Sequence, residues 1–135
     1  MRHGTLNALA GAVLMLLPTM AGAQDAPESL KVYFPSGGAQ VLQAQSDTID
    51  QAARLFREGN PFVMILAGGA DTVGVAERNL DLSLRRARAV ADALVARGIP
   101  VDRLQVLGRG NSELAVDTGA GIANAENRVV EITWR

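Results

Sequence analysis

Leu66-Ala67-Gly68-Gly69-Ala70-Asp71-Thr72-Val73-Gly74 is the stretch around which the fold of this 135-residue chain is organised. The apolar run 62–67 leads into it and predicts a central strand that is buried on both faces. The glycines after this run predict a tight turn. They serve either a close strand-to-helix connection or the approach of the backbone to a ligand.

A helix is expected to follow the turn, over residues 76–97. One leucine and three polar or charged side chains are expected on one side of this helix. Asn79, Leu82, Ser83 and Arg86 have the spacing i, i+3, i+4, i+7. Asp71 is expected at the start of this helix, where backbone N–H groups are unpaired and the helix dipole favours anions. Such a set can hold a small zwitterion, with its ammonium at Asp71 and its carboxylate at Arg86.

Three arginines lie close together on this helix, and only one of them has that spacing. We expect the Arg86 side chain to lie along the apolar stripe with its head free. We expect Arg85 and Arg88 to belong to a solvated helix face and to have little effect on binding.

The other elements are predicted from the spacing of apolar residues and from the glycines and prolines that end each run. We expect strands over 30–34, 103–107 and 128–135, and a first helix over 44–57 that Gly59 ends in a left-handed conformation. Residues 108–126 form a long polar loop, of a length that is usually functional or poorly ordered. The element order predicts an α+β fold with two main helices on one face of a four-stranded mixed sheet, and it leaves the strand order open.

The N-terminal 23 residues have the pattern of a secretory signal peptide. A short basic start precedes an apolar run, and Ala21-Gly22-Ala23 offers a cleavage site. The alternative is an uncleaved membrane anchor, but the apolar run is shorter than the ~20 residues of a span. We therefore expect residues 24–29 to be a short linker, residues 30–135 to be the folded domain, and the mature chain to have neither a transmembrane span nor an N-terminal lipid.

Composition argues against most enzyme classes and against nucleic acid as a partner. The chain has no cysteine, and its one histidine, His3, lies in the predicted signal. The mature chain therefore has no thiol or imidazole for catalysis or metal binding, and we expect neither an enzyme nor a cofactor. Without Arg2 it keeps 12 of its 13 basic residues against 14 acidic ones, so it has no basic excess.

Several separated motifs resemble one known family. The pattern Asn-x-x-Leu-Ser-x-x-Arg-Ala-x-x-Val is matched at residues 79–90, after Gly-x-x-Asp-x-x-Gly at residues 68–74. Leu107-Gly108-Arg109-Gly110 and the terminal residues 127–132 extend the likeness. The chain, over about residues 30–135, is similar to the OmpA-like C-terminal domains, a family that includes peptidoglycan-associated lipoproteins and the periplasmic parts of flagellar stators.

This resemblance implies a function and a set of site residues. The family binds peptidoglycan non-covalently, through the diaminopimelate residue of the stem peptide. By correspondence, the ligand-binding residues of this chain are Asp71, Thr72, Asn79, Leu82, Arg86 and Arg128. The implied location is the periplasm of a Gram-negative envelope, peripheral to the outer membrane, with outer-membrane or other envelope proteins as further partners.

Three departures from the family pattern define an alternative. Gly69 and Ala70 stand where the family has histidine and threonine, Val129 replaces a second arginine, and Pro35 replaces an acidic or polar residue. The alternative is a periplasmic protein-interaction module that keeps the fold, has lost or retuned its ligand site, and uses the loop 108–126 as its contact surface.

Overall fold

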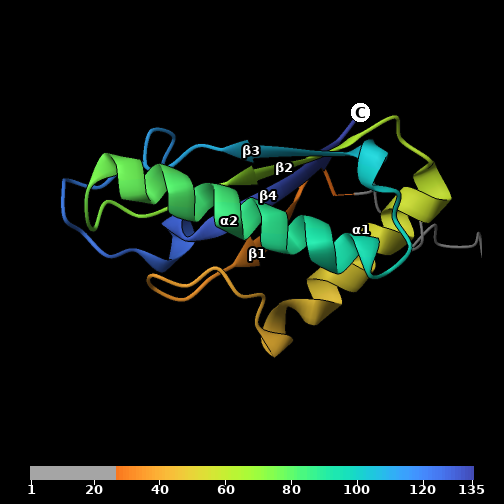
Figure 1. Ribbon diagram of the computed structural model, residues 1–135, viewed down its shortest axis with the longest axis horizontal. Coiled ribbons are helices and arrows are strands. Elements are labelled where there is room, and N and C mark those ends of the chain that lie inside the picture. Colours follow the sequence, from red (N-terminus) through yellow and green to blue (C-terminus); the bar gives the residue numbers. More distant parts are fainter. Residues whose placement is uncertain (1–26) are drawn as a thin grey trace, which may run out of the picture.

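The computed structural model describes residues 27–135, so the predicted signal peptide and the first part of the linker lie outside the described residues. The two main helices and four strands of the prediction are present in the expected order (Figure 1). They are β1 (Leu30–Tyr33), α1 (Ser46–Gly59), β2 (Met64–Gly68), α2 (Ala76–Val95), β3 (Leu104–Gly108) and β4 (Val129–Trp134). Three short 3-10 turns lie between them.

The strands form one mixed sheet in the order β1-β4-β2-β3. Strands β2 and β3 are parallel and are joined through α2, whereas β4 returns to lie antiparallel between β1 and β2. The prediction of a four-stranded mixed sheet in an α+β fold is therefore confirmed, and β2 is an inner strand as expected.

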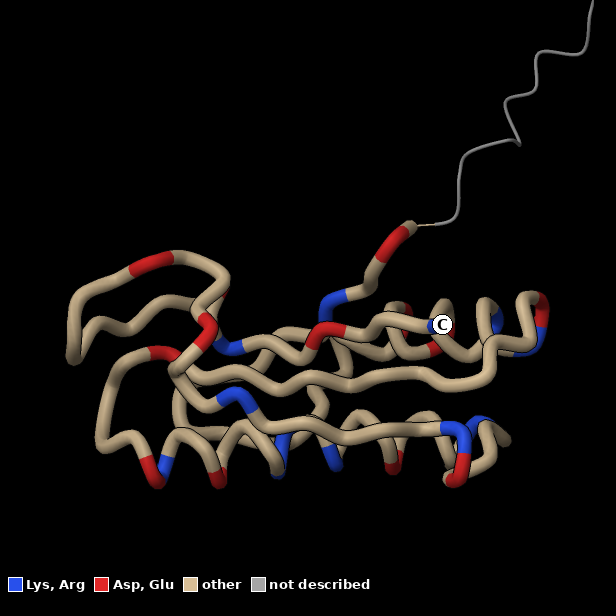
Figure 2. The backbone as a smooth tube through the Cα atoms, turned by 90° about the horizontal axis from the view of Figure 1, so that it is seen from above, with Lys and Arg blue, Asp and Glu red and all other residues tan. Residues whose placement is uncertain are grey.

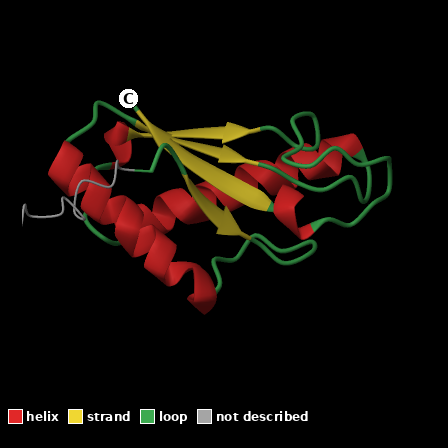
Figure 3. Ribbon diagram, turned by 180° about the vertical axis from the view of Figure 1, so that it is seen from behind, coloured by secondary structure: helices red, strands yellow, loops and turns green. Residues whose placement is uncertain are grey.

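Both helices pack on the same face of the sheet, and Figure 3 shows the opposite face in front of them. Alternate residues of each strand point to the helices, such as Met64 and Leu66 of β2, which are fully buried. The core also takes Ile49, Ala52, Ala53 and Phe56 from α1 and Ala87, Val90, Ala91 and Leu94 from α2. These are the stripes that a 3.6-residue period predicts.

The prediction that the run 62–67 is buried on both faces is wrong. Ile65 is only partly buried, and Phe62, which precedes the strand, is 88% exposed. The reason is that the helices cover one face only, so the opposite face of β2 receives no helix. A continuous apolar run therefore did not distinguish a two-sided strand from a one-sided one.

The end of α1 also differs from its prediction. The left-handed residue is Asn60, with φ 44°, and its N–H donates to the carbonyl of Phe56. Asparagine tolerates this conformation because its short polar side chain can bond locally. Gly59 keeps a helical conformation as the last residue of α1.

Within residues 27–135, neither helix is both long and apolar enough to cross a bilayer.

Candidate functional site

A pocket of about 200 Å³ lies beside the first half of α2, under the turns that follow β1 and β2. Its walls are Ser36, Gly37, Asp71, Val73, Gly74, Arg78, Asn79, Leu82, Arg85 and Arg86. Four of the six residues predicted to bind a ligand are among them: Asp71, Asn79, Leu82 and Arg86. Because they come from the β2–α2 turn and from one side of α2, the predicted spacing does bring them together.

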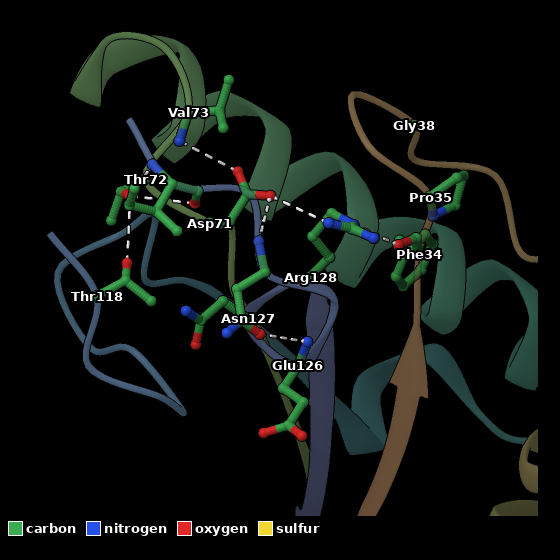
Figure 4. Close-up of polar contacts among 12 residues, drawn as sticks. Phe34, Pro35, Gly38, Asp71, Thr72, Val73, Thr118, Glu126, Asn127 and Arg128 are labelled. Atoms are coloured by element: carbon green, nitrogen blue, oxygen red, sulfur yellow. Dashed lines mark hydrogen bonds and ion pairs between the residues drawn. The ribbon is translucent and has the colours of Figure 1, made fainter. Parts of the chain in front are cut away.

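Asp71 is buried, with 6% of its surface exposed, and its carboxylate is held from three directions. One oxygen accepts from the N–H of Val73 at 3.2 Å, and the other accepts from the N–H of Asn124 at 3.4 Å and from Arg128 Nη1 at 3.2 Å (Figure 4). The ion pair with Arg128 is little exposed on either side. These contacts hold the carboxylate in a fixed position at the start of α2.

Arg86 is fully buried, and its guanidinium binds three backbone carbonyl oxygens. Nε donates to Gly38 at 2.8 Å, Nη1 to Gly69 at 3.0 Å and Nη2 to Pro35 at 3.0 Å. Burial is the main cause that lowers the pKa of Arg86 to about 10, and the negative charge of Asp71 opposes that shift. The side chain is therefore still cationic at neutral pH.

The expectation that the Arg86 head is free is wrong. The side chain joins three segments, because the turn after β1 supplies the carbonyls of Pro35 and Gly38 and the turn after β2 supplies that of Gly69. The sequence predicts that the position of Pro35 gives no ligand contact, and the structure shows a different role for this residue, because its carbonyl is one of the three acceptors of Arg86. Proline has no backbone N–H to donate, but it keeps its carbonyl oxygen as an acceptor.

Asn79 and Leu82 lie on the side of α2 that forms the pocket wall. Asn79 is buried, and its side-chain amide donates to the carbonyl of Val73 at 3.0 Å, which ties the turn to the helix. Leu82 is partly buried and gives the pocket an apolar patch.

Thr72 and Arg128 are not in the pocket wall. The Thr72 hydroxyl donates to the carbonyl of Gly119 at 2.7 Å and accepts from the N–H of Ile122 at 2.9 Å. Arg128 lies behind Asp71, where its Nε also donates to the carbonyl of Phe34 at 3.0 Å (Figure 4). Thr72 therefore anchors the long loop, and Arg128 positions Asp71.

The loop 108–126 is fixed to the domain at several points along its length. The side chain of Asn127, which is 2% exposed, bonds both the N–H and the carbonyl of Val116. The N–H of Gly121 donates to the carbonyl of Thr72 at 2.9 Å. This segment is thus fixed against the turn that follows β2, with Ile122 among its exposed side chains.

Sequence reasoning missed two arginines in the wall, Arg78 and Arg85. Arg85 was expected to lie on a face unrelated to the site, yet it lines the pocket, whereas Arg88 does not. Arg78 is not at any of the motif positions. The spacing that selected Asn79 contains the missing signal, because residues 78, 82 and 85 are also spaced i, i+4, i+7 and therefore share the neighbouring side of α2.

A second hollow of about 230 Å³ lies on the open face of the sheet, beside the loop. Its two basic and two acidic side chains balance each other. Arg109 pairs with Glu113 at 3.2 Å, and Lys31 stands opposite Glu131 in the strand register. It contains none of the predicted ligand-binding residues. Among residues 27–135, no group of three or more histidine, cysteine or acidic side chains could hold a metal ion.

Comparison with known proteins places these residues in a family context. A sequence model of the OmpA family matches residues 33–128. The probable lipoprotein YiaD of Escherichia coli is 30% identical over 102 residues, which are 76% of this chain and 47% of that protein. The peptidoglycan-binding protein ArfA of Mycobacterium tuberculosis is 30% identical over 101 residues, which are 75% of this chain and 31% of that protein. The chain thus spans less than half the length of either relative.

A solved structure supports the fold. The peptidoglycan-associated lipoprotein from Burkholderia pseudomallei superposes with a TM-score of 0.72 at 23% identity, over 78% of this chain and 90% of that one. At that level of identity the likeness concerns the fold alone.

Proposed function

The chain belongs to the OmpA family, and from that premise we propose that it binds the peptidoglycan of the cell wall without forming a covalent bond. A relative that is 30% identical bears the name peptidoglycan-binding protein, which supports this function for the shared domain. The proposed location follows from the ligand: the cell envelope and, with the predicted signal peptide, the periplasm. The role is one of binding and not of catalysis.

We assign the ligand contact to the pocket beside α2 and propose that it takes the ammonium and the carboxylate at the free end of diaminopimelate. The observation that carries this assignment is that Asp71, Asn79, Leu82 and Arg86 line one pocket with charges of both signs. Its volume of about 200 Å³ is below the usual range for whole drug-sized ligands, so it suits the end of a side chain.

Asp71 keeps the capacity to accept from an ammonium. A carboxylate has about four acceptor positions, and three are used by Val73, Asn124 and Arg128. The histidine and threonine that the family has at positions 69 and 70 are not needed to hold this carboxylate, because the backbone and Arg128 hold it. This preorganisation supports a site that is still functional despite the departures in sequence.

Arg86 keeps donors for a carboxylate. A guanidinium has five N–H groups, and three of them donate to the carbonyls of Pro35, Gly38 and Gly69. Two are left, one on each Nη nitrogen, which is the forked arrangement that a carboxylate accepts. Because the side chain is fully buried, we expect the turn at Ser36 and Gly37 to shift slightly when the ligand enters.

The test is co-sedimentation with purified sacculi, using Asp71→Asn. This change keeps the shape of the side chain and removes its charge, so an ammonium loses its partner. We expect binding to fall by at least tenfold, because the loss of one member of a desolvated charge pair costs ~2 kcal/mol or more. Free diaminopimelate should compete with sacculi for the wild-type protein.

Arg88→Ala is the matched control, because Arg88 is exposed on the same helix and lies outside the pocket. The thermal melting of each variant is measured in parallel, since Asp71 also pairs with Arg128 inside the fold. A folded Asp71→Asn protein that still sediments with sacculi as the wild type does would refute the assigned site. Absence of binding by the wild-type protein would refute the function.

A further inference from the structure

The wall of the pocket beside α2 carries more positive charge than a zwitterion can match. Three arginines line it, Arg78, Arg85 and Arg86, against one acidic residue, Asp71. The charge of Asp71 is itself balanced by Arg128 from behind. A ligand end with one ammonium and one carboxylate has no net charge, so this excess would be left to Asp81, the exposed partner of Arg85, and to solvent.

The excess is local to the pocket. Figure 2 shows acidic and basic positions interspersed along the outer side of α2, so the helix as a whole is not a basic surface. Within the pocket, however, the acidic side chains of α2 are absent from the wall, and Arg78 and Arg85 face the space. They stand seven residues apart, about 10 Å along the helix axis, so they flank the pocket on either side of Leu82.

Both of these arginines are available to a ligand. Arg78 is exposed and forms no ion pair within residues 27–135. Arg85 pairs with Asp81 at 2.9 Å, but both side chains are more than half exposed, and such pairs contribute little to stability. An incoming carboxylate can therefore replace Asp81 at little cost.

We propose that Arg78 and Arg85 bind a second carboxylate of the same ligand, which makes this site selective for stem peptides with free rather than amidated carboxyl groups. This inference rests on the proposed function of the pocket. In a stem peptide, the glutamate next to diaminopimelate is linked through its γ-carboxyl, so its α-carboxyl is the nearest free anion. Conversion of that carboxyl to a carboxamide removes the charge and leaves the size almost unchanged.

The experiment measures the affinity of the full chain for two synthetic tripeptides by isothermal titration calorimetry. One tripeptide is alanyl-γ-glutamyl-diaminopimelate with a free glutamate α-carboxylate, and the other carries a carboxamide there. In both, the carboxyl through which diaminopimelate would continue the stem peptide is capped as an amide, so it cannot replace the glutamate anion. We expect the wild type to prefer the free acid by about three- to tenfold, since exposed charge pairs contribute modestly each and two arginines take part. The double variant Arg78→Gln/Arg85→Gln should bind both peptides equally, at the level of the amidated one.

Arg88→Gln is the matched control and should keep the wild-type preference. Equal wild-type affinity for the two peptides, with both lost in Asp71→Asn, would overturn this inference and leave the proposed function intact. An equal loss of preference in Arg88→Gln would also overturn it, because the effect would then come from a diffuse positive field. If the wild type binds neither peptide, the inference and the proposed function both fail.

Discussion

Replacement of Arg86 by alanine is expected to lower the free energy of unfolding by about 3 kcal/mol, in addition to any loss of ligand binding. The guanidinium satisfies the carbonyls of Pro35, Gly38 and Gly69, and each carbonyl left without a donor costs on the order of 1 kcal/mol. The change also leaves a void beneath the turn after β1. For a domain of this size the melting temperature should fall by roughly 10–20 °C.

The measurement is a thermal or urea unfolding curve of the full chain, with Arg88→Ala as the control. Arg88 is exposed on the same helix, so its loss should change stability by less than about 0.5 kcal/mol. Arg86→Lys keeps the charge but not the planar fork, and it should recover only part of the stability. An Arg86→Ala protein that melts within a few degrees of the wild type would show that this arginine serves the ligand alone.

This expected result limits how binding data on Arg86 can be interpreted. An alanine substitution at Arg86 would remove both the three hydrogen bonds that join the turns to α2 and the proposed ligand contact. A loss of binding would therefore not identify the cause. Asp71→Asn is the cleaner probe of the pocket, because the side chain keeps its shape and its one remaining oxygen can still accept from Asn124 and Arg128, so that only the Val73 N–H loses its acceptor. The comparison of both variants separates the two roles.

The sequence predicts the elements well because their signals are local. The stripes of α1 and α2 and the alternation of β4 reflect one covered face of a helix or strand, and periodicity reports that face directly. Strand order has no local signal, since the return of β4 to a place between β1 and β2 depends on contacts between distant residues. The partial exposure of Ile65 has no local signal either, because it depends on whether another element covers the second face of β2.

The sequence predicted which residues line the pocket, but it did not predict their hydrogen bonds within the protein. Asp71, Asn79, Leu82 and Arg86 meet because a turn and a helix period place them together. The acceptors of Arg86 are backbone carbonyls, which every residue has, so no side-chain pattern reveals them. For the same reason, the role of Thr72 in anchoring the loop near Gly119 and Ile122 was not visible in the sequence.

Gly68→Ala is expected to disrupt the domain as severely as any change in the pocket, although Gly68 is not part of the pocket wall. A Cβ atom at this position would lie 1.9 Å from the carbonyl oxygen of Ser83 and 2.8 Å from its carbonyl carbon. Both atoms belong to the backbone of α2, so no side-chain rotation relieves the clash, and the helix must move away from β2. This settles the alternative left by the sequence, since Gly68 is required by the close strand-to-helix contact.

The displacement should affect stability and binding together. Overpacking of a core by small groups typically costs 1–3 kcal/mol, and a clash with a helix backbone should reach about 3 kcal/mol or more. Asp71 follows Gly68 by three residues, and Arg86 follows Ser83 by three, so a shift of α2 from β2 also separates the two sides of the pocket. Urea unfolding and sacculus binding should therefore both report the change.

Gly59→Ala is the matched control for the same chemical change. Gly59 ends α1 in a helical conformation, and a Cβ atom there would meet nothing within 4 Å. Alanine in such a position should leave the urea midpoint unchanged or raise stability by up to about 1 kcal/mol, because it restricts the unfolded chain. If Gly68→Ala unfolds at the same midpoint as Gly59→Ala, then α2 does not lie as closely on β2 as described. The pocket between the turn and the helix must then have a larger volume than about 200 Å³.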